Sequence, residues 1–271
     1  MMQDAVLEII AHGAWNGGRR VDNSIYENKG MVFKGGIPVT HQSIEERMGV
    51  RTRMVAPMDE RIGVTAFRDL LETSGIDAAR IRVIIGATNI GEDKEDPGPV
   101  SRFPYELVRN VCPQALVFDL YAGCPGFNVG VEALFMLSLA GALKPGDLSV
   151  IIGAENIHRA KAFKPLDTAN IIFGDDALAT ALETGALAGG CQTGRVMAET
   201  TVEAGDNFIA AIADQLLPWA RAGRLDGIII ANQLGRVECR IPASAARVQH
   251  ALMERLHPEA AAAGTFKNFR A

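Results

Sequence analysis

Apolar and polar positions alternate in blocks along the chain, and these blocks predict buried strands separated by helices. Nearly continuous apolar runs, rich in β-branched residues, at 81–89, 115–123 and 148–156 are typical of strands buried on both faces of a sheet. The segments 58–76 and 127–144 have the length and periodicity of helices. Strands and helices that follow one another in this way are typical of α/β layers with a parallel sheet.

Further segments extend this pattern toward both ends. The helix over 127–144 carries one charged residue, Glu132, before Lys144, so we expect it to be buried on nearly all sides. Ser43 is placed to cap a short helix within 41–56. The remaining predicted segments are a strand at 1–12, a Gly- and Lys-rich excursion at 16–40, a strand pair at 169–184 broken by Gly174–Asp176, and helices at 207–223 and 242–256.

Composition narrows the class of protein. The chain has 271 residues and a formal net charge of -5, and it contains no long basic run, which argues against nucleic acid as a partner and weakly against a membrane surface. The first residues lack the basic start and cleavage site of a signal peptide. The four cysteines lie far apart without a metal-binding spacing, so we expect a cytoplasmic protein with reduced thiols and no metal.

Cys124 lies in the stretch DLYAGCPGFNV, between a predicted strand and a predicted helix. A thiol at that position would face the unpaired N–H groups and the positive dipole end of the helix, and both favour the reactive thiolate. The residues by themselves leave two readings open, a nucleophile or a small buried core residue.

Several segments together resemble the β-ketoacyl-ACP synthase III family of the thiolase superfamily. IEERMGVRTRMVA is similar to an early helix and turn of that family, and VFDLYAGCPGFNVGVEAL to the segment that carries its catalytic cysteine. SVIIGAENI, NIIFGDDALATALE and DGIIIANQLGRV resemble three later segments, so the likeness covers about residues 40–250.

The resemblance implies a layered αβαβα fold of two related halves, with residues 1–185 as the half carrying Cys124 and 186–271 as a truncated second half. It also implies an acyltransferase in which Cys124 takes an acyl group from acyl-CoA or an acyl carrier protein. Claisen-type condensation or acyl transfer would follow, with no tightly bound cofactor.

The chain departs from the family in the groups that should assist the cysteine. Asn232 occupies the position of the family's histidine, and it can donate a hydrogen bond but cannot take a proton. Asn268 is the candidate for the second partner, although it lacks the expected glycine. His158 is a candidate substitute base, against the alternative of an ordinary loop residue.

Arg47, Arg51 and Arg53 lie where the family meets the phosphates of CoA or the carrier protein, against the alternative of a solvated helix face. The shortened second half predicts a homologous ketosynthase or thiolase-type subunit as partner. Two functions remain open at this point: an acyltransferase subunit, or a structural subunit that pairs with a complete homologue and has lost the chemistry. A thioester hydrolase that uses His158 is a more distant alternative.

Overall fold

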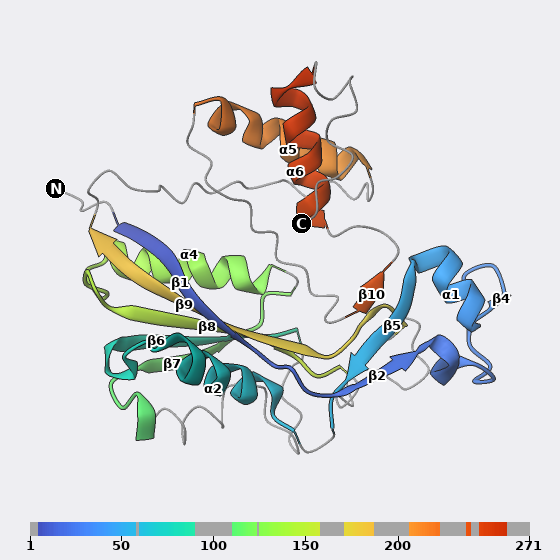
Figure 1. Cartoon of the computed structure of the whole chain (residues 1–271), viewed down its shortest axis with the longest axis horizontal. Coiled ribbons are helices and arrows are strands. Elements are labelled where there is room, and N and C mark those ends of the chain that lie inside the picture. Colours follow the sequence, from blue (N-terminus) through green and yellow to red (C-terminus); the bar gives the residue numbers. More distant parts are fainter. Residues whose placement is uncertain are drawn as a thin grey trace. The chain divides into compact units, whose positions relative to one another are not determined.

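The computed structural model describes residues 5–57, 60–89, 110–123, 125–157, 171–186, 206–222, 237–239 and 244–258. The chain divides into two compact units (Figure 1). The first contains Met1–Ala188 and Ala231–Arg240, and the second contains Gly189–Ile230 and Ile241–Ala271. Because a late segment belongs to the first unit, this division differs from the two predicted halves, which stay a prediction.

Among the described residues of the first unit, five strands form one sheet in the order β1-β9-β8-β6-β7 (Figure 1). Strands β6, β7 and β8 are parallel, as the three apolar runs predict, while β9 is antiparallel to both β8 and β1. The strands are β1 (Ala5–Ala14), β6 (Ile81–Ala87), β7 (Leu116–Leu120), β8 (Leu148–Glu155) and β9 (Asp176–Ala186). Adjacent parallel strands bring their carboxyl ends to the same edge of the sheet.

Helices α2 and α4 pack on opposite faces of this sheet (Figure 1). Helix α2 (Ile62–Ser74) buries Phe67 and Leu70 in one core cluster, and its C-cap residue, Gly75, has a φ of 68°. Helix α4 (Gly126–Leu139) buries Leu134 in the other cluster, with Ile85 and Ile151 of the sheet. Each face of the sheet therefore has its own apolar core.

The prediction that the helix over 127–144 is buried on nearly all sides is wrong for α4. Its buried residues are Gly126, Gly130 and Leu134, whereas Met136 is 59% exposed. The buried positions recur every four residues and mark the side that packs on the sheet. Helix α4 thus has apolar residues on nearly every side, but only the side that packs on the sheet is fully buried.

The predicted strand pair at 169–184 is also wrong, because one strand, β9, begins at Asp176. The residues immediately before it make a different contact. The Asp175 N–H donates to the Met54 carbonyl at 2.9 Å, and the Asp175 carboxylate accepts from the Ala56 N–H at 2.8 Å. Asp175 is fully buried, so it joins the start of β9 to the end of a distant strand.

That distant strand is β5 (Val50–Val55), which lies between β2 (Arg19–Asp22) and β10 (Val237–Cys239) in an antiparallel sheet of described residues. Helix α1 (His41–Met48) precedes β5. Its cap is Thr40 and not Ser43: the Ser43 side chain forms the reciprocal half of the capping box. The remaining short elements of this region are η1 (Asn23–Tyr26), β3 (Val32–Phe33) and β4 (Ile37–Pro38), while η2 (Ala78–Arg80) directly precedes β6.

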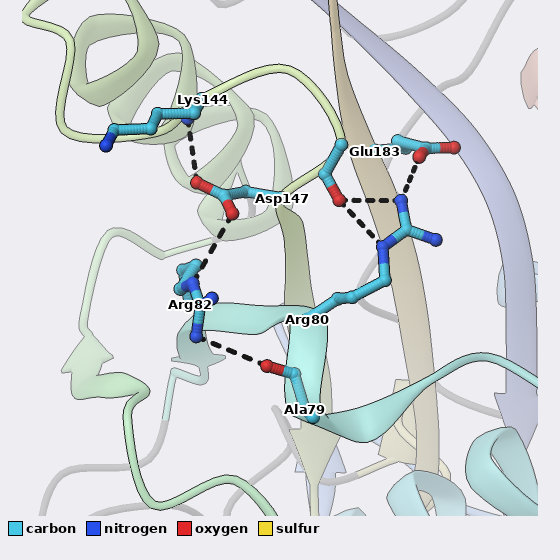
Figure 2. Close-up of polar contacts among 7 residues, drawn as sticks. Ala79, Arg80, Arg82, Lys144, Asp147 and Glu183 are labelled. Atoms are coloured by element: carbon cyan, nitrogen blue, oxygen red, sulfur yellow. Dashed lines mark hydrogen bonds and ion pairs between the residues drawn. The ribbon is translucent and has the colours of Figure 1, made fainter.

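Charged side chains hold the amino-end edge of the parallel strands together (Figure 2). Arg80 donates two hydrogen bonds to the Gly146 carbonyl, at 2.8 and 2.6 Å, and pairs with Glu183 of β9. Arg82 pairs with Asp147 at 3.3 Å, in the turn that leads into β8. These side chains are partly exposed, so each pair contributes modestly to stability. Their role is to fix the turn before β8 against β6 and β9.

The described part of the second unit contains helices α5 (Asp206–Arg221) and α6 (Ser244–Leu256), close to the predicted 207–223 and 242–256. They share an apolar cluster of Ala213, Leu216, Val248 and Leu252. Arg255 of α6 also pairs with Asp214 of α5 at 2.5 Å. Within the described chain no helix combines the length and apolarity needed to cross a membrane.

Candidate active site

Several described polar residues and Gly123, the residue before Cys124, lie at the carboxyl edge of the parallel strands. Thr88 and Asn89 follow β6, Gly123 comes three residues after β7, and Glu155 ends β8. The Thr88 N–H donates to the Leu120 carbonyl at 3.2 Å, which joins the ends of β6 and β7. In open α/β sheets this edge is where ligands bind.

A tight turn links β7 to α4 at this edge. Gly123 has a φ of 66°, a left-handed conformation that favours glycine, and its carbonyl accepts from the Gly126 N–H at 3.0 Å. Helix α4 begins at Gly126, and its N-cap residue, Pro125, makes no side-chain cap hydrogen bond. The positive end of the helix dipole therefore faces the turn. Cys124 itself lies outside the described residues, but Gly123 and Pro125 on either side of it are described.

Glu155 is a buried ionisable group at this edge, with 6% of its surface exposed. Its carboxyl accepts from the Asn89 N–H at 2.5 Å and from the Thr88 hydroxyl at 3.3 Å. Burial raises the pKa of Glu155 from 4.5 to about 7, against the two hydrogen bonds, which lower it, and together with the nearby Asp175, which adds to the rise. At neutral pH this carboxyl is therefore divided between its charged and neutral forms.

Asn89 lies between the carboxyl and the turn. Its backbone donates to Glu155, and a Cβ placed on Gly123 would lie 3.8 Å from its side-chain oxygen, within van der Waals contact. The sequence analysis missed Thr88, Asn89 and Glu155. The available signal was one carboxyl residue at the end of the otherwise apolar run LSVIIGAE, opposite a polar pair at the end of IRVIIGATN.

Comparison with known proteins shows which enzymes this chain resembles in sequence. The chain is 31% identical over 150 residues to the β-ketoacyl-[acyl-carrier-protein] synthase III of Novosphingobium aromaticivorans, and 34% identical over 152 residues to that of Rhodospirillum rubrum. Each match covers 54% of this chain and 44% of the relative, so it spans less than half the length of these curated relatives. Over about half of its length the chain is β-ketoacyl-ACP synthase III-like. No protein-family model matches it.

Solved structures of a priming β-ketosynthase and of a synthase III share the fold. The priming β-ketosynthase of the R1128 polyketide pathway matches with a TM-score of 0.56 at 18% identity, over 94% of this chain and 80% of that one. The synthase III of Pseudomonas aeruginosa PAO1 matches with a TM-score of 0.56 at 19% identity, over 92% and 79%. The mixed α/β fold is therefore that of the synthase III structures, while a truncated second half stays a prediction.

Within this synthase III-like chain, Arg53 does not have the position that the resemblance predicted for it. Arg53 is 1% exposed, and its guanidinium donates to the Ile171 carbonyl at 2.6 Å, to the Tyr26 hydroxyl at 3.2 Å and to the Asn23 side chain. A group enclosed in this way cannot reach the phosphate of a ligand at the surface. The expectation of phosphate binding is wrong for Arg53, whose role is to hold β5 in the core.

Arg47 and Arg51 are exposed and fit the expectation better. The Arg47 guanidinium lies over the Phe33 ring, 5.5 Å from its centroid. Arg51 pairs with Glu45 at 2.9 Å, and both side chains are partly exposed. An anionic ligand would therefore compete with Glu45 for Arg51, while Arg47 keeps its donors toward solvent.

His158, Asn232 and Asn268 lie outside the described residues. The first described residues after Asn232 are those of strand β10, which pairs with β5 through Val237 and Arg53. Within the described residues, no three His, Cys, Asp or Glu side chains are grouped so that they could hold a metal ion.

Proposed function

We propose that the chain is an acyltransferase of the ketosynthase III type, in which Cys124 accepts an acyl group from acyl-CoA or an acyl carrier protein. The Cys124 thiolate attacks the thioester carbonyl, the CoA or carrier thiol leaves, and an acyl-cysteine thioester remains. The acyl group then passes to a second thioester in a Claisen-type condensation, or to another acceptor.

The observation that carries this proposal is the turn around Gly123. Gly123 and Pro125, the neighbours of Cys124 in the chain, lie between the carboxyl end of β7 and the start of helix α4, whose N-cap residue makes no side-chain cap hydrogen bond. Both features favour a thiolate with access to a ligand. Family membership gives that thiolate a reaction, because the named relatives are β-ketoacyl-ACP synthases III.

The assisting groups are proposed from the sequence, with partial support from the structure. Asn232 donates to the thioester oxygen in the place of the family's histidine, and Asn268 is the second donor. The assignment of Ala231–Arg240 to the same compact unit as Gly123 supports the role of Asn232. His158 is the candidate base, and Arg47 and Arg51 are the candidates for the phosphates of CoA.

Intact-mass spectrometry tests the first step. The purified chain is incubated with acetyl-, octanoyl- or benzoyl-CoA, and we expect a single acyl adduct that peptide mapping assigns to Cys124. Cys112 provides the matched control because it is 1% exposed and burial raises the pKa of its thiol to about 11, so Cys112→Ala keeps the adduct while Cys124→Ala abolishes it. No adduct with any donor, even with a co-purified homologous subunit present, contradicts the proposal.

Asn232 favours a second candidate function, a structural subunit that pairs with a complete ketosynthase or thiolase homologue. An asparagine cannot supply the proton transfer of a histidine, and one missing donor of this kind typically lowers the rate about 100- to 1000-fold. We therefore expect the lone chain to accept an acyl group but to condense it with malonyl-CoA negligibly. In the complex, turnover unchanged by Cys124→Ala identifies the structural subunit, and its loss identifies the acyltransferase.

A further inference from the structure

Glu155 has no part in the acyl transfer as derived so far, yet its carboxyl is buried near the segment that contacts the Cys124 turn. Its carboxyl contacts the segment after β6 at two atoms: Oε1 accepts from the Asn89 backbone and Oε2 from the Thr88 hydroxyl. A carboxyl fully engaged on one neighbouring segment, with 6% of its surface exposed, determines where that segment lies.

The segment that Glu155 holds is the one in contact with the cysteine turn. The side-chain oxygen of Asn89 lies beside Gly123, and Gly123 is bonded directly to Cys124. The Thr88 N–H also holds the carbonyl of Leu120, at the end of the strand that leads into the turn. The hydrogen bond from Thr88 to Leu120 and the position of the Asn89 side chain beside Gly123 thus relate the Glu155 carboxyl to both ends of the segment 120–123.

We propose that Glu155 is a positioning residue for the Cys124 turn, acting through Thr88 and Asn89, and that its charge state sets how readily the Cys124 thiol reacts. This deepens the proposed acyl transfer and rests on it for its biological meaning. Physically it requires only the contacts above and the like charge of carboxylate and thiolate, since each anion disfavours the ionisation of the other.

The acidic residues next to Glu155 on the neighbouring strand must be considered in its titration. Asp175 precedes β9, and Asp176 begins β9 as the strand partner of Glu155. The Asp175 carboxyl opposes the ionisation of Glu155, whereas the donors on Thr88 and Asn89 assist it. The burial of the carboxyl raises its pKa to about 7, so its charge changes within the pH range in which a thioester-using enzyme works.

The test is the pH dependence of Cys124 alkylation by iodoacetamide, read by peptide mass for the wild type, Glu155→Gln and Thr88→Val. Glutamine keeps an acceptor for the Asn89 N–H but cannot ionise. Near pH 5.5, where the wild-type carboxyl is mostly neutral, we expect Glu155→Gln and the wild type to react equally. Near pH 8.5 we expect Glu155→Gln to react about threefold faster, because the like charge is absent.

Thr88→Val separates a charge effect from a packing effect. It removes the hydroxyl that stabilises the carboxylate, so the pH at which the wild-type profile bends should move upward. Glu183→Gln makes the same chemical change near the other end of the β8–β9 pair and should leave the profile unchanged. A Glu155→Gln protein that fails to fold exposes Cys112 to alkylation, and Thr88→Val then decides alone.

A ratio of Glu155→Gln to wild-type rates that stays constant with pH, or an unmoved bend in Thr88→Val, overturns the positioning role. The proposed function fails in a different way. If Cys124 shows the Glu155-dependent profile but takes no acyl group from any thioester, the acyl transfer is refuted and the positioning role stands. If Cys124 is acylated but the ratio of Glu155→Gln to wild-type alkylation rates does not change with pH, the positioning role is refuted and the acyl transfer stands.

Discussion

Replacing Glu155 by glutamine should remove a pH dependence of folding stability that this one carboxyl imposes. In the folded protein the pKa of Glu155 is about 7, and in the unfolded chain it returns to about 4.5. Below pH 4.5 the carboxyl is neutral in both states, and its contribution to stability is fully present. As the pH rises toward 7 the unfolded chain releases the proton while the folded chain keeps it, so stability falls.

The magnitude follows from the two pKa values. A difference of one in pKa corresponds to about 1.4 kcal/mol, so the full loss between pH 4.5 and pH 8 is about 3 kcal/mol. Glutamine does not titrate and carries no such loss. We therefore subtract the free energy of unfolding of Glu155→Gln from that of the wild type. This difference should fall by about 2.5 kcal/mol between pH 5 and pH 8.

Urea unfolding followed by tryptophan fluorescence measures this difference. The chain has two tryptophans, and Trp15 is fully buried in the first unit beside the Glu60 carboxylate, which accepts from its indole N–H at 2.7 Å. A Trp219→Phe background removes the tryptophan in α5 and leaves a reporter of the first unit. Glu183→Gln, whose side chain is 34% exposed, is the matched control. The reasoning is refuted if the wild type and Glu155→Gln lose stability in parallel from pH 5 to pH 8.

Three further predictions concern the framework that holds the site. Gly13→Ala should prevent stable folding, because its Cβ would lie 2.0 Å from the backbone nitrogen of a helix α2 residue, whereas Gly153→Ala, with nothing within 4 Å, should fold normally by circular dichroism and urea titration. Arg53→Ala should cost about 3 kcal/mol in urea unfolding, because it leaves buried acceptors unsatisfied, while Arg51→Ala should change stability by less than about 0.5 kcal/mol; equal costs would contradict the structural assignment of Arg53. Gly123→Ala should cost about 1 kcal/mol, because alanine is strained at a φ of 66°, and it should slow Cys124 alkylation; an unchanged alkylation rate would show that the turn does not set the reactivity of the thiol.

The sequence alone determined the elements whose signals are local. Runs such as IRVIIGATN and LSVIIGAEN are apolar and β-branched over their whole length, and they form the parallel strands β6 and β8 as predicted. Gly75 ends α2 because glycine adopts a positive φ without strain. The stretch around Cys124 is also one of the segments that resemble the synthase III family.

Only the tertiary structure decided which of the distant segments meet. Arginine is a residue type that often binds phosphate, but the Arg53 guanidinium donates instead to the carbonyl of Ile171, 118 residues further along the chain. No local sequence pattern encodes that contact. Glu155 ends an apparently ordinary strand, and its significance comes from Asn89, which is 66 residues earlier. Burial and hydrogen bonding between such distant residues set the pKa of a carboxyl and the exposure of an arginine, because both depend on the surrounding atoms in space and not on neighbours in the chain.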